Sequence, residues 1–144
     1  MTHTLLHQMD IKAPPKKVFA ALTTRDGLAG FWTSEVQAEP RVGSVARFNF
    51  PGAPAPLRMR IDALEPDKRV AWTCLGDFPG WEGTTVSWLL SPAADGAGTS
   101  VLFRHGDVSA WPEPGIASVN YTWGQIAARL KGYSETGTPQ PFLA

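Results

Sequence analysis

The feature that most constrains the fold is an amphipathic segment at residues 116–133. Its apolar residues recur in steps of three and four, which places them in one stripe along one side of an α-helix. The stripe consists of Ile116, Val119, Trp123, Ile126, Ala127, Leu130 and Tyr133. The sequence therefore predicts a long helix with one buried face, and a sheet is needed to cover that face.

Most of the chain before this helix alternates apolar and polar residues, which is typical of antiparallel strands covered on one side. We expect strands within residues 4–12, 36–40, 45–50, 57–64, 70–74, 84–90 and 99–105. Pro14-Pro15 indicates the start of a short helix after the first strand, because proline suits the first helical turn. A second short helix is expected over residues 28–32, with its last two residues, Phe31 and Trp32, exposed.

The predicted order is one strand, two short helices, about six further strands and the long helix. This order indicates an α+β fold, in which a curved antiparallel sheet of about six to seven strands wraps around the last helix. The chain has 144 residues, which is an ordinary domain length, and it contains neither an internal repeat nor a linker. We therefore expect residues 1–144 to form a single domain.

The charge and the cysteine content exclude several classes of function. Lys+Arg and Asp+Glu both number 13, so the net charge is zero and offers no footprint for nucleic acid or for an anionic membrane. No apolar stretch approaches the ~20 residues of a membrane helix, and residues 1–10 lack the features of a signal peptide. The single cysteine, Cys74, cannot form an intrachain disulfide. A cytoplasmic protein is therefore expected.

Short motifs that span nearly the whole chain carry a family resemblance. In order they are Ile11-Lys12-Ala13-Pro14-Pro15, Val18-Phe19-Ala20-Ala21-Leu22-Thr23, Gly27-Leu28-Ala29, Phe31-Trp32-Thr33, Asp67-Lys68-Arg69-Val70, Trp81-Glu82-Gly83-Thr84 with Val86, Gly98-Thr99 with Phe103 and His105, Trp123, Leu130-Lys131-Gly132-Tyr133 and Glu135-Thr136-Gly137. Together they resemble the START-like (SRPBCC) superfamily, in the branch related to the C-terminal domain of the Hsp90 ATPase activator (AHSA1-like). Two positions depart from the pattern: Arg25 stands where the family often has proline, and Gly124 follows Trp123 instead of preceding it.

The resemblance implies a helix-grip fold, of the START-like or Bet v 1-like kind, with a hydrophobic cavity between the sheet and the long helix. Relatives of this kind include lipid carriers, polyketide cyclases, drug-sequestering proteins and co-chaperones. Because one fold serves many functions, the resemblance implies a container and no single activity.

Large apolar side chains on the inward face of the predicted sheet, with their neighbours on the helices and one loop, are the candidate ligand-binding residues. Singly, each would be an ordinary core residue, but as a group they have the apolar character of a small-molecule pocket. The candidates are Phe31, Trp32, Phe48, Met59, Ile61, Trp72, Trp81, Trp88, Phe103, His105 and Trp123. We expect a small hydrophobic ligand, aromatic or acyl, and no cofactor.

His105 is the most informative polar residue, because the alternation places it on the inward face just past Phe103. It could hydrogen-bond a ligand or act as an acid or base near neutral pH. The alternative is a histidine at a strand end, bonded to backbone or water, since the sequence places no carboxylate beside it. No catalytic residue is assigned; a cyclase or hydrolase using His105 and a co-chaperone-like interaction module remain alternative functions.

The sequence predicts no metal site. His3 and His7 are four residues apart, but their segment is a predicted strand and no third ligand is evident. Cys74 is expected to be a small apolar core residue. A protein partner is compatible with the sequence but no feature indicates one.

Overall fold

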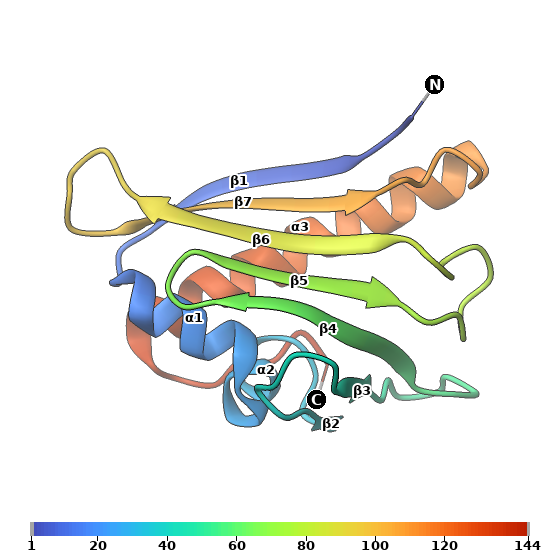
Figure 1. Ribbon diagram of the computed structural model, residues 1–144, viewed down its shortest axis with the longest axis horizontal. Helices are drawn as coiled ribbons and strands as arrows, with labels where there is room; N and C mark the ends of the chain where they lie inside the picture. The colour runs from blue at the N-terminus through green and yellow to red at the C-terminus, as the bar shows by residue number, and fades with distance from the viewer. Residues whose placement is uncertain (1, 144) are drawn as a thin grey trace.

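The computed structural model describes residues 2–143 and contains a seven-stranded antiparallel sheet with three helices. The elements are β1 (Leu5–Ile11), α1 (Pro15–Thr23), α2 (Arg25–Phe31), β2 (Val36–Gln37), β3 (Val45–Phe48), β4 (Leu57–Glu65), β5 (Arg69–Cys74), β6 (Thr85–Pro92), β7 (Thr99–Gly106) and α3 (Glu113–Thr136). The strands lie in the order β1-β7-β6-β5-β4-β3-β2, and α3 crosses one face of the sheet (Figure 1). The predicted α+β helix-grip fold is confirmed.

Helix α3 carries the predicted apolar stripe but is longer at both ends. It begins at Glu113, directly after Pro112, and proline also occupies its first turn, where a missing N–H costs nothing. It ends before Gly137, whose φ of 76° gives the left-handed conformation that commonly stops a helix. Trp123, Ile126 and Leu130 are buried against the sheet, as the spacing predicts. None of the helices in residues 2–143 is long and apolar enough to cross a membrane.

The inward parity of the strands is also confirmed. Pairing places Val86 opposite His105 and Trp88 opposite Phe103, so these side chains share one face of the sheet. All four are at most 1% exposed. The face that packs on α3 is therefore mostly apolar, and its imidazoles are His105 on β7 and His7, which lies opposite Phe103 on β1.

The expected exposure of Phe31 and Trp32 is wrong, because the two residues are 0% and 2% exposed. The Thr24 hydroxyl accepts a hydrogen bond from the Gly27 backbone N–H (3.0 Å), so α2 begins earlier than expected and its last residues turn toward the sheet. A Cβ at Gly30 would lie 2.5 Å from the Tyr133 ring. Glycine at this position lets α2 pack directly on α3.

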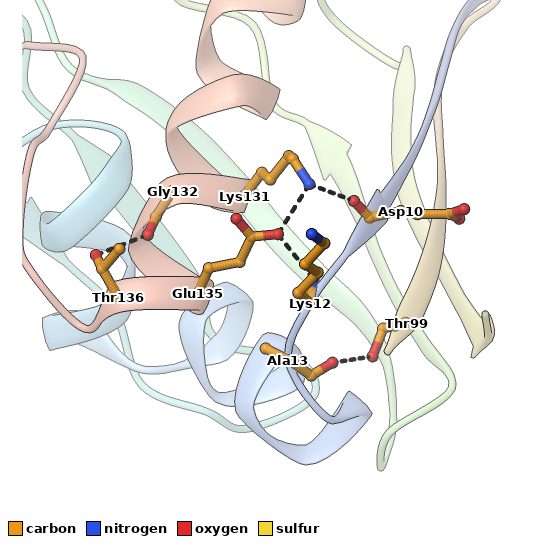
Figure 2. Close-up of polar contacts among 8 residues, drawn as sticks. All are labelled: Asp10, Lys12, Ala13, Thr99, Lys131, Gly132, Glu135 and Thr136. Carbon is orange, nitrogen blue, oxygen red and sulfur yellow. Dashed lines mark hydrogen bonds and ion pairs between the residues drawn. The ribbon is translucent and has the colours of Figure 1, made fainter. Parts of the chain in front are cut away.

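The end of the edge strand β1 is held to the end of α3 by polar contacts (Figure 2). Lys131 Nζ donates to the Asp10 carbonyl (2.6 Å) and to Glu135 (2.8 Å), and Glu135 accepts from the Lys12 backbone N–H (2.7 Å). These bonds satisfy backbone groups that an edge strand otherwise leaves open to another chain. On the α3 side, the charged side chains of Lys131 and Glu135 make these bonds.

Candidate functional site

The centre of the space between the sheet and α3 is filled by aromatic rings. The Phe103 and Trp123 rings lie 4.6 Å apart, and the Trp88 ring lies 4.8 Å from Phe103. The Trp32 ring stacks on Phe48 at 4.2 Å. The cavity that the sequence led us to expect opposite these residues is therefore occupied by their own side chains, because interdigitated rings pack to the density of a core.

A pocket of about 190 Å³ lies beside this packed centre. Its walls come from α3, the end of α2, the β3–β4 loop with the start of β4, the β5–β6 loop, and the segment that follows α3. The lining side chains are Trp32, Phe50, Leu57, Phe78, Trp81, Val119, Thr122, Trp123, Ile126, Phe142 and Leu143. The pocket thus collects residues from five parts of the chain.

Three of the predicted ligand-binding residues, Trp32, Trp81 and Trp123, line this pocket. The other eight do not line it and are buried in the core: Phe31, Phe48, Met59, Ile61, Trp72, Trp88, Phe103 and His105. Alternation identifies which side chains point inward, but it does not separate those that touch each other from those that border a space.

Eight lining residues were missed as site residues. Val119 and Ile126 belong to the predicted helix stripe and Phe50 to a predicted strand, so a signal for them existed. Phe142 and Leu143 lie beyond the last predicted element, where no periodicity marks them. Their position depends on a contact between distant parts of the chain.

The pocket is apolar, and none of its lining side chains is ionisable. Thr122 carries the one hydroxyl among them, which donates to the Ser118 carbonyl at 3.0 Å. Trp81 presents an aromatic wall from the β5–β6 loop and stacks on Trp111 at 5.4 Å. The pocket therefore has aromatic walls, and none of its lining side chains could form an ion pair with a charged ligand.

His105 lies behind the pocket wall and both of its ring nitrogens have partners. Trp123 Nε1 donates to His105 Nδ1 at 3.1 Å. The neutral ring then carries its proton on Nε2, which donates to the Thr84 hydroxyl at 3.0 Å. That hydroxyl donates to the Trp81 carbonyl at 2.7 Å. A continuous chain of hydrogen bonds therefore joins two residues of the pocket wall, Trp123 and Trp81, through His105.

Burial keeps His105 neutral. The residue is 0% exposed, and desolvation lowers its pKa from 6.5 to about 4. The rings of Trp81 and Trp111 lie 4.8 Å and 5.3 Å from the imidazole, in edge-on contact. The inward position expected for His105 is confirmed, and its nitrogens bind protein groups. Neither nitrogen is left free to accept a proton from a substrate.

The other candidate polar residues lie apart from the pocket. His7 Nε2 is 3.2 Å from the Asn120 carbonyl. Cys74 is 1% exposed, and burial raises the pKa of its thiol to about 11, so it stays protonated. Residues 2–143 contain no group of three or more His, Cys, Asp or Glu side chains arranged to hold a metal ion.

The chain is similar in sequence and fold to known proteins. The profile of the family described as activator of Hsp90 ATPase homolog 1-like protein matches residues 12–135. The Aha1 dimer from Colwellia psychrerythraea is 33% identical, with a TM-score of 0.82 over 94% of this chain and 98% of that one. No curated protein sequence matches the chain.

Two further solved structures share the fold. DynU16, from the dynemicin biosynthetic locus, is 24% identical with a TM-score of 0.78, over 96% of this chain and 49% of that one. CalU16 from Micromonospora echinospora is 21% identical with a TM-score of 0.73, over 97% of this chain and 78% of that one. At these identities the similarity establishes the fold alone.

Proposed function

Because the chain belongs to the family of activator of Hsp90 ATPase homolog 1-like proteins, we propose that it uses the pocket beside the aromatic centre to bind a small, neutral, hydrophobic ligand. The preferred ligand carries one aromatic ring with a short substituent. Its affinity comes from apolar burial and from contact with the indole rings of Trp32, Trp81 and Trp123. A cytoplasmic location, suggested by the sequence, is part of the same proposal.

The observation that carries this proposal is the combination of size and chemistry in the pocket. An engineered apolar cavity of about 150 Å³ binds benzene, and this pocket has about 190 Å³ with no ionisable side chain in its lining. A charged ligand would lose its hydration without gaining a partner. A single neutral ring therefore fits better than a carboxylate or a large polycyclic compound.

The alternative functions have less support. An enzyme that uses His105 as acid or base needs a free ring nitrogen near the substrate, and both nitrogens are bonded to Trp123 and Thr84. A co-chaperone-like surface needs a broad exposed apolar patch. The exposed large apolar side chains in residues 2–143 are Leu6, Val42, Val45 and Tyr121, which are spread over β1, β3 with the turn before it, and α3.

The test is a titration of the purified protein with toluene and with benzoate, followed by protein NMR. We expect toluene to shift the signals of the pocket indoles and benzoate to leave them unchanged, because the anion must be desolvated. Equal binding of both ligands, or binding of neither, would contradict the proposal.

A pocket-filling variant gives the necessary control. Val119→Phe places a ring in the pocket from α3, and we expect it to abolish toluene binding. Ala128→Phe adds the same ring to an exposed position of the same helix, outside the pocket lining, and should bind toluene as the wild type does. Loss of binding in both variants would show that the ligand occupies another site.

A further inference from the structure

Residues 138–143, which we call the strap, form one wall of the pocket although they belong to no helix or long strand. After α3 ends at Thr136, the chain turns back and runs beside the end of α2 (Figure 1). Phe142 and Leu143 of the strap line the pocket opposite α3. The strap therefore forms a part of the pocket wall that is separate from the sheet and from α3.

The strap is held in register by main-chain hydrogen bonds to the end of α2. The backbone N–H groups of residues 140, 142 and 143 donate to the carbonyls of Gly30 (2.9 Å), Phe31 (3.1 Å) and Trp32 (2.8 Å). A helix leaves its last carbonyls without partners inside the helix, so the end of α2 offers ready acceptors. The Leu143 carbonyl accepts from the Ser34 N–H at 3.0 Å. Because main-chain groups make these bonds, substitution of a strap side chain leaves them in place.

Part of the pocket wall belongs to the fully buried core. Trp32, Leu57 and Trp123 are each at most 2% exposed and are packed on the core. Phe142 is only partly buried, with solvent on its outer side. The available space therefore ends at fully buried side chains on one side and at Phe142 and Leu143 on the strap side, where Phe142 carries the larger side chain.

From this arrangement, and building on the proposed function, we propose that Phe142 is the residue that sets the upper size limit of the ligand. With its ring in place the pocket admits one aromatic ring. Without that ring the pocket extends toward solvent by about the space of one ring, and a fused two-ring hydrocarbon becomes the preferred ligand.

The experiment compares toluene and naphthalene in the wild type and in Phe142→Ala, with affinities measured by NMR titration of the full chain. We expect the ratio of naphthalene affinity to toluene affinity to rise by about tenfold in the variant, which is within the range that a pocket achieves by size alone. The more conservative Phe142→Leu, which retains an apolar side chain on the strap, should raise the ratio less. It provides the same test if Phe142→Ala does not fold.

Phe19→Ala is the matched control. Phe19 is also a partly buried phenylalanine packed against the core, but it does not line the pocket. We expect its affinity ratio to equal that of the wild type. An unchanged ratio in both Phe142 variants, or an equal rise in Phe19→Ala, would overturn the role of Phe142. Absence of binding of both hydrocarbons to every protein would instead refute the proposed function.

Discussion

At the centre of the grip, the rings of Trp88, Phe103 and Trp123 lie 4.6 to 6.1 Å from one another. At the pocket, the rings of Trp81 and Phe78 have each other on one side and a space of about 190 Å³ on the other. Both regions are built from aromatic side chains on the same scaffold. The difference is that central rings such as Trp88 and Phe103 have neighbours on every side, whereas rings that line the pocket lack them on one side.

This comparison separates stability from binding. A central ring contributes burial and dispersion to the folded state, while a pocket ring leaves part of that contribution to be completed by a ligand. Trp123 belongs to both regions, because it packs on Phe103 and also lines the pocket. The experiments below measure how far the two regions differ.

The largest expected effect comes from truncating a central ring and a pocket ring in parallel. Trp88 is 0% exposed, and Trp88→Ala should lower the free energy of unfolding by about 3–5 kcal/mol, through lost burial and the cavity left behind. Trp81→Ala should cost less than half as much, because Trp81 is only partly buried. Urea denaturation of the two variants checks this, and equal losses would erase the distinction between the regions.

The next effect is the pH dependence contributed by His105. Its pKa is 6.5 in the unfolded chain and about 4 in the folded protein, because burial disfavours the charged ring. Between these values the unfolded chain binds a proton that the folded protein does not. The contribution to stability is thus fully present above pH 6.5 and is lost as the pH falls to about 4. The loss should amount to roughly 3 kcal/mol.

His105→Gln isolates this contribution. The variant lacks the titrating ring, so its stability should stay flatter than that of the wild type between pH 6.5 and about 4. Asp95, Asp107 and Glu135, whose pKa values are lowered by hydrogen bonds to their carboxylates, remain in both proteins and cancel in the difference. Parallel stability curves for the two proteins would show that His105 is not held neutral by burial.

A smaller effect distinguishes two buried tryptophans by their N–H groups. Trp123 Nε1 donates to His105, whereas Trp88 Nε1 has no hydrogen-bond partner among the described residues. Trp123→Phe leaves the buried His105 Nδ1 without a donor, while Trp88→Phe removes an unpaired donor. Trp123→Phe should therefore cost about 1–3 kcal/mol more than Trp88→Phe.

Thermal denaturation of the two phenylalanine variants, with a toluene titration of each, makes this comparison. Only Trp123→Phe should also weaken toluene binding, because Trp123 lines the pocket and Trp88 does not. If Trp88→Phe weakened binding equally, the packed centre would have to be counted as part of the site.

The smallest effect lies outside both regions, at the polar contacts that join the end of β1 to the end of α3. Glu135→Gln keeps the shape of the side chain but removes its charge opposite Lys131, whose side chain is 41% exposed. Since water screens such a pair, the variant should lose less than about 1 kcal/mol. If Glu135→Gln lost more stability in chemical denaturation than Trp81→Ala, the contacts between β1 and α3 would contribute more to stability than this part of the pocket wall.

Much of this architecture follows from local sequence patterns. The steps of three and four in α3 place Trp123, Ile126 and Leu130 on the sheet, because a helical stripe of apolar residues has one stable orientation. The alternation in β6 and β7 places Trp88, Phe103 and His105 inward, because successive strand residues point to opposite faces. These patterns repeat over a few residues, so the sequence alone determines the helix-grip layers and the inward faces.

Only the tertiary structure decides which inward side chains touch and which border a space. Trp123 and His105 are 18 residues apart, and their hydrogen bond depends on how α3 sits over β7. Phe142 reaches the pocket because carbonyls at the end of α2 bind the strap, more than 100 residues away in the chain. Periodicity reports the direction of a side chain, but the position of a space depends on packing between segments that no local pattern relates.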